Sequence, residues 1–113
     1  MDTVHLYTDV LKVLGDTLVR MTGPQWDAML QTASREERSK AATLMMQAQT
    51  ARLTLANAAL NEIVDELRQT EDDLASGVRR LREALDRFDR VEQVLNGISS
   101  VVSTVARVIP LVA

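Results

Sequence analysis

The sequence has no cysteine, two prolines, four glycines and one each of tryptophan, tyrosine and phenylalanine among its 113 residues. The absence of cysteine excludes disulfides and thiolate metal sites. Two prolines and four glycines are too few for the many turns of a small β-fold. Because aromatic residues are scarce, the apolar fraction of 46% consists mostly of aliphatic side chains. Such side chains suit the contacts between helices, so the composition predicts a single all-α domain.

The sequence also lacks the features of several functional classes. Its net charge of −3 provides no basic footprint for nucleic acid. His5 is the only histidine, so no second histidine or cysteine completes a metal site. No phosphate-binding glycine loop, G-x-S-x-G or H-E-x-x-H motif occurs. We therefore expect no enzymatic activity, no catalytic residue, no cofactor and no bound metal. The start Met1-Asp2-Thr3 lacks the basic region of a signal peptide, which favours a cytoplasmic location.

The first third of the chain predicts two helices. One covers residues 3–22, and Gly23-Pro24 separates it from a short helix over 24–33. Ser34 and Glu37 then match a capping box, which either starts a further helix or lies within a continuous one. Steps of three and four residues place one set of apolar side chains on a single face of the first helix, which Val10 and Val13 widen: Val4, Tyr7, Leu11, Leu14, Leu18 and Met21.

The strongest pattern is an apolar repeat of seven residues. Its first column, position a, is apolar throughout and reads Met46, Leu53, Leu60, Leu67, Leu74, Leu81, Phe88, Leu95, Val102 and Ile109. Position d follows three residues later and is interrupted by Gln49, Thr70 and Gly77. A repeat of this length predicts one long heptad helix over 35–109. Apolar residues at the flanking positions favour a helical bundle with the N-terminal helix docked on the long one, rather than a two-stranded coil.

The region around Gly77 allows two arrangements. An acidic block over 62–73 precedes a basic block over 79–90, which favours antiparallel packing. The unbroken register favours a continuous helix that self-associates antiparallel, whereas a turn at Gly77 gives a three-helix bundle within one chain. Either arrangement predicts these charge pairs: Asp72 and Asp73 with Arg79 and Arg80, and Glu66 with Arg87.

The segment 94–113 carries a broad apolar stripe opposite a face of small hydroxylic residues, with Arg107 as its single charge. One interpretation is a membrane-active helix, although a spanning helix needs about 20 mostly apolar residues. The other is the last part of the bundle, docked on the first helix. We favour the second interpretation because the stripe keeps the heptad register.

These patterns predict a non-enzymatic helical interaction protein. It would self-associate as a homo-oligomer or bind a helical protein partner, and it would not bind nucleic acid. The alternative is a membrane-active protein that uses 94–113, which is less favoured. The predicted interaction seam consists of Leu53, Leu60, Ile63, Leu67, Leu74, Leu81, Phe88, Val91, Leu95, Ile98, Val102, Val105 and Ile109.

Overall fold

A computed structural model describes residues 3–109, and throughout this range the chain is helical, with short turns and no strand. The predicted all-helical fold is thus confirmed. The helices are α1 (Thr3–Met21), α2 (Pro24–Gln31), α3 (Arg35–Asn57), α4 (Leu60–Gln69), α5 (Glu71–Arg87) and α6 (Val91–Val108).

Local signals determine where the first helices end and begin. Gly23 lies between α1 and α2, and Pro24 is the first residue of α2, where its missing N–H costs no helical hydrogen bond. The predicted capping box at the start of α3 is confirmed. The Glu37 N–H donates to Ser34 Oγ at 3.1 Å, and the Ser34 N–H donates to Glu37 Oε1 at 3.3 Å. Each of these two bonds satisfies a donor that the helix itself leaves without an acceptor.

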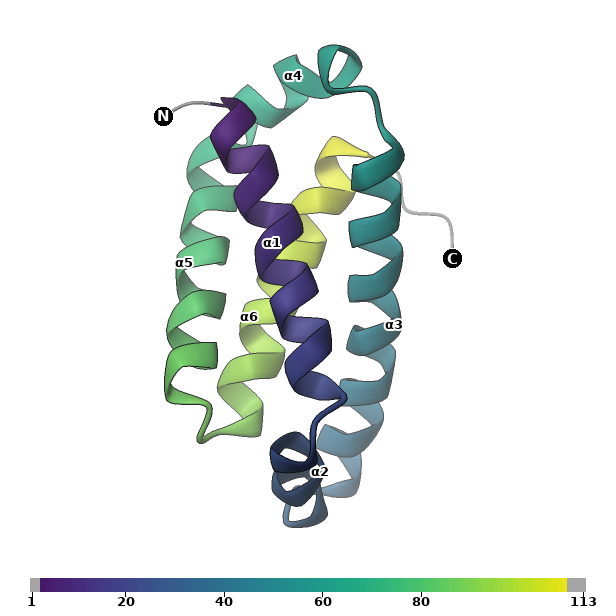
Figure 1. The fold of residues 1–113 in the computed structure, drawn as a ribbon, viewed down its shortest axis with the longest axis vertical. Coiled ribbons are helices and arrows are strands. Elements are labelled where there is room, and N and C mark those ends of the chain that lie inside the picture. Colours follow the sequence, from purple (N-terminus) through teal and green to yellow (C-terminus); the bar gives the residue numbers. More distant parts are fainter. Residues whose placement is uncertain (1–2, 110–113) are drawn as a thin grey trace.

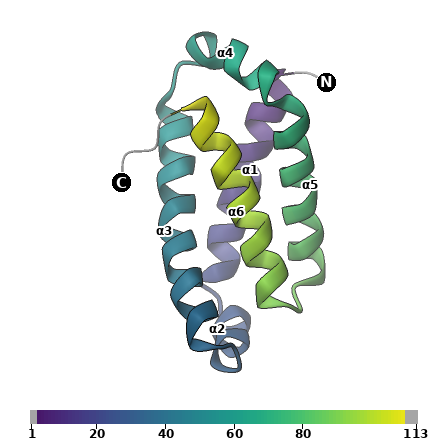
Figure 2. The ribbon, with the colours of Figure 1, turned by 180° about the vertical axis from the view of Figure 1, so that it is seen from behind.

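The four longer helices, α1, α3, α5 and α6, lie side by side (Figure 1). α3 and α5 each contact both α1 and α6, so α1 and α6 occupy opposite corners of the bundle. Figure 2 shows the bundle from the opposite side, where α6 lies between α3 and α5. α2 lies at one end of the bundle, and α4 crosses the other end to connect α3 to α5. The result is a compact helical molecule with extents of 43 × 27 × 19 Å.

The continuous helix expected over 35–109 is wrong, because the chain forms four helices there. Ala58 and Ala59 have extended backbone, Thr70 bends the chain between α4 and α5, and the chain turns again after Arg87. A single helix of that length would leave most of its apolar columns in water. Folding it back buries those columns against one another, and each buried aliphatic side chain contributes about 1.5–3 kcal/mol.

The possible turn at Gly77 is also wrong. Gly77 is buried in the middle of α5 and faces α6. A Cβ at this position would lie 3.3 Å from Ser100 Oγ and 3.3 Å from Val101 Cγ2. The residue therefore allows two helices to approach closely, and it does not provide backbone freedom for a turn.

The turn between α5 and α6 falls at Phe88, which adopts the left-handed conformation with φ 45° and ψ 48°. This conformation is unfavourable for a bulky residue. The ring is buried, however, with its centroid 5.8 Å from that of Trp26 and 4.0 Å from the guanidinium carbon of Arg20. Burial and the cation–π contact offset the strain, so packing rather than glycine ends α5.

The predicted stripe of α1 lies against the core except at Val4, and the buried face extends to Leu6. Val4 is 54% exposed, whereas Leu6, Val10 and Val13 are buried. The difference arises because α1 contacts both α3 and α5, so its core face centres on Val10 and Val13. The expected docking of the C-terminal segment on this helix is also not seen, since α6 packs mainly on α5 and α3.

The ion pairs differ from those expected across Gly77. Asp73 and Arg107 join α5 to α6 at 2.9 Å, and Asp16 and Arg82 join α1 to α5 at 2.7 Å. Glu66 lies on α4 and Arg87 at the end of α5, and no ion pair joins them among the described pairs. The other acidic and basic residues predicted to face each other, such as Asp73 and Arg79, lie on the same helix α5. They cannot meet across a turn because no turn occurs between them.

Candidate interaction surface

The structure divides the predicted interaction seam between the core and the surface. Leu53 is 64% exposed on α3. Leu60 and Ile109 are partly buried at the edge of the core. The remaining seam residues are buried within this chain: Ile63, Leu67, Leu74, Leu81, Phe88, Val91, Leu95, Ile98, Val102 and Val105. In this conformation most of the seam already packs against the chain's own helices.

The division arises because α3 is apolar on two faces. The face directed into the bundle carries Ala41, Leu44, Ala48, Ala51 and Leu55, all of which are buried. These residues recur at steps of three and four, as expected for one helix face. The three alanines allow neighbouring helices to approach α3 closely. The opposite face carries the first residues of both columns of the heptad repeat, a and d.

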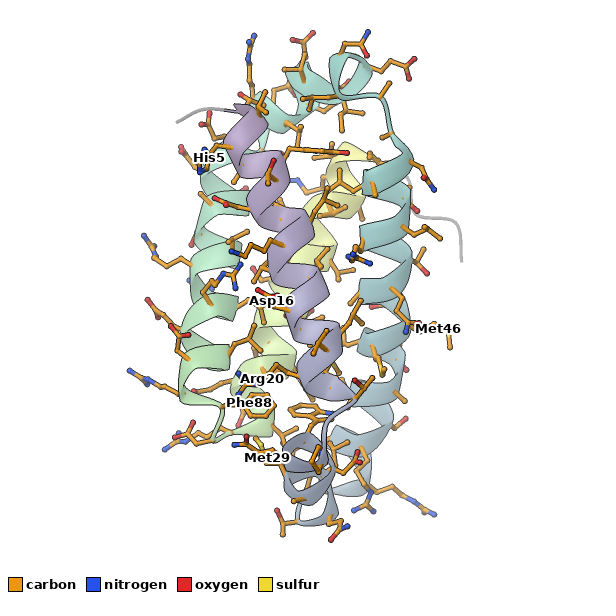
Figure 3. The ribbon with its side chains drawn as sticks, in the orientation of Figure 1. His5, Asp16, Arg20, Met29, Met46 and Phe88 are labelled. Carbon is orange, nitrogen blue, oxygen red and sulfur yellow. The ribbon has the colours of Figure 1, made fainter. Side chains whose placement is uncertain are left out.

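We call this opposite face the outer α3 stripe, and each of its residues is exposed. It consists of Ala42, Met46, Gln49, Leu53 and Ala56. Met46 is 67% exposed, and it points away from the bundle in Figure 3. Met46 and Leu53 are two of the four large apolar side chains that are exposed among residues 3–109. The spacing of the outer α3 stripe is that of a helix prepared to pack against another helix.

The outer α3 stripe has almost no charge around it. Arg52 is the only charged residue between Lys40 and Glu62 in the sequence. Its side chain lies over α1, where a Cβ added at Gly15 would be 3.2 Å from Arg52 Nε. The one charge is therefore directed toward α1, and the stripe itself is apolar except for the amide of Gln49.

The apolar side of the C-terminal segment is packed in the core. α6 buries Val94, Leu95, Ile98, Val101, Val102, Val105 and Val108. Within residues 3–109, no helix is long and apolar enough to cross a membrane. The last four residues of the predicted 94–113 helix lie outside the described residues.

The single tryptophan, the single histidine and the methionines at 29, 45 and 46 are dispersed over the molecule. Trp26 is buried, Met29 and Met45 are partly buried, and Met46 belongs to the outer α3 stripe. His5 is exposed on α1 near one end of the bundle (Figure 3). Across the part of the chain that the structure describes, no group of three metal-ligating side chains is brought together.

A shallow groove between α5 and α6 is the second surface feature. Its volume is about 310 Å³. Its lining consists of Arg80, Glu83, Ala84, Arg87, Gln93, Asn96 and Gly97. Glu83 lies three residues after Arg80 and four before Arg87, so one carboxylate shares a helix face with both guanidinium groups. This arrangement is typical of a charged, solvated helix face.

The chain matches no protein-family model, no curated protein sequence and no solved structure. The interpretation of the outer α3 stripe therefore rests on its residues and their surroundings.

Proposed function

We propose that this protein is a non-enzymatic helical interaction module that docks a partner helix on the outer α3 stripe. The observation that carries the proposal is the exposure of Met46 and Leu53, seven residues apart on one helix face, with no charged side chain on the stripe. Folding leaves these first two residues of column a in water, although it buries most of the later residues of the column. A helix face of this kind is typical of a surface that packs against another helix.

The chemistry of the surface defines the partner. It is an amphipathic helix that presents apolar side chains at i, i+3 or i+4, and i+7, with small or amide residues between them. Covering the exposed two thirds of Met46 and Leu53 would contribute about 2–4 kcal/mol, from about 1.5–3 kcal/mol for each fully buried side chain. Association also costs several kcal/mol of lost freedom, so we expect weak, reversible binding.

Selection of helical peptides from a display library tests this proposal. The bait is the full chain, and the matched control is the double variant M46E/L53E, in which both substituted positions are exposed. We expect the selected peptides to carry the apolar spacing described above and to lose at least tenfold in affinity for the control. Peptides that bind both baits equally would exclude the outer α3 stripe as a docking surface, and so would a failure to select any helical peptide for a chain that also does not self-associate. Circular dichroism checks that the control is folded.

The membrane-active alternative requires α6 to leave the bundle. That release would remove eight large buried side chains from the core and expose to water the faces of α3 and α5 that they cover, at a cost of about 10–25 kcal/mol. Since the stability of a small domain is about 5–15 kcal/mol, such a release amounts to unfolding the bundle.

A further inference from the structure

We propose that the partner helix on the outer α3 stripe is α3 of a second copy of this chain, packed antiparallel; this inference rests on the proposed function. The first observation is that the stripe complements itself. The two-fold axis of the antiparallel pair crosses the outer α3 stripe at the level of residue 51 along the helix. Met46 then lies opposite Ala56 of the second copy. Gln49 then lies beside Leu53 of the second copy. Each large side chain meets a smaller or flexible one, as helix packing requires.

The second observation is the distribution of charge at the two ends of the bundle. The start of α3 carries Arg35, Arg38 and Lys40 together with Glu36 and Glu37, a net charge of +1, whereas α4 carries Glu62, Asp65 and Glu66 together with Arg68, a net charge of −2. These two segments lie at opposite ends of the molecule (Figure 1). An antiparallel pair of α3 helices places the basic end of one copy beside the acidic end of the other. A parallel pair would place ends of the same net charge together, so the charge distribution favours the antiparallel orientation.

The third observation is the low charge of α3 itself. A second copy brings the same nearly uncharged stripe, since the side chain of Arg52 lies over Gly15 of α1. Two stripes therefore meet without burying an unpaired charge, which would strongly oppose association. The stripe runs from Ala42 to Ala56 and spans about 21 Å at 1.5 Å per residue. An interface of this length is small, so the dimer forms at micromolar or higher concentrations.

Disulfide trapping tests both the partner and the orientation, because the chain has no cysteine of its own. The variants M46C and A56C are prepared separately, and both substitutions fall on exposed positions of α3. In the antiparallel pair, position 46 of one copy faces position 56 of the other. Position 46 of one copy is then about 15 Å along the helix axis from position 46 of the other, beyond the reach of a disulfide. In a parallel pair, each substituted position would instead face its own counterpart.

We expect the mixture of M46C and A56C to give a covalent dimer at least tenfold faster than either variant alone under mild oxidation. Wild-type chain should show a monomer–dimer equilibrium in sedimentation, and M46E/L53E should remain a single chain. Faster trapping of each variant with itself would overturn the antiparallel orientation.

A wild-type chain that sediments as a single copy up to millimolar concentration would overturn the second copy as partner. In that case, helical peptides that still require Met46 and Leu53 would leave the docking function standing. If such peptides are also absent, both proposals fail.

Discussion

Replacing Gly97 with alanine tests the close approach of α5 and α6. A Cβ at Gly97 of α6 would lie 3.0 Å from the Cα of Leu81 on α5 and 3.1 Å from its Cδ1. A backbone atom cannot move aside as a side chain can, so the two helices must separate. Overpacking of this kind costs about 1–3 kcal/mol. Alanine is favoured over glycine within a helix by about 1 kcal/mol, which partly offsets the cost.

Gly15 is the matched control, since it also lies within a helix. There a Cβ would meet the flexible side chain of Arg52, with Nε at 3.2 Å. We expect G15A to be stabilised by up to about 1 kcal/mol, because the side chain of Arg52 moves away. Both variants gain the same helix propensity from the change of glycine to alanine. This gain therefore cancels when their free energies of unfolding are compared. G97A should therefore be less stable than G15A by about 1–3 kcal/mol.

Urea unfolding followed by circular dichroism measures the free energy of unfolding of both variants, and the fluorescence of Trp26 provides a second probe. The slope m should be the same for both, because the surface exposed on unfolding hardly changes. If G97A is as stable as G15A, α5 and α6 do not approach each other as closely as described.

Three further experiments test other contacts. F88A should lower the free energy of unfolding by about 3–5 kcal/mol. The fluorescence of Trp26 should also shift to longer wavelength, because the neighbouring ring is lost. An unchanged fluorescence spectrum would contradict the contact between the two rings. S34A should lower the free energy of unfolding by about 0.5–2 kcal/mol, since the Glu37 N–H loses its acceptor; full stability in thermal unfolding would show that the capping box is not formed. A double-mutant cycle on Asp16 and Arg82 should give a coupling of less than about 1 kcal/mol that decreases with added salt, because both side chains are partly exposed. A larger coupling, insensitive to salt, would show that the pair is buried.

Local signals in the sequence predicted the early helix boundaries correctly. Gly23-Pro24 separates α1 from α2, and Ser34 with Glu37 starts α3. These signals work because they act within a few residues and depend little on the rest of the fold. The breaks at Ala58 and Phe88 have no such signal. Alanine favours helix, and the left-handed Phe88 is stabilised by Trp26 and Arg20, which are distant in the sequence.

The heptad register predicted the buried residues of α5 and α6, such as Leu74, Leu81 and Leu95. It did not predict which face of α3 would be buried. That face carries alanines at positions 41, 48 and 51, which weigh little in an apolar pattern beside Met46 and Leu53. Only the packing of α3 against α1 and α6 decides between the two faces, and a single sequence does not contain that packing.

The central claim is that one apolar repeat serves the core in α5 and an exposed surface in α3. The free energies of unfolding of L53A and L81A, measured side by side in dilute solution, test it most directly. Both residues are leucines at position a, but Leu53 is 64% exposed and Leu81 is fully buried. We expect L81A to lose about 2–5 kcal/mol and L53A to remain within about 0.5 kcal/mol of the wild type. Similar losses in both variants would contradict the division of the repeat.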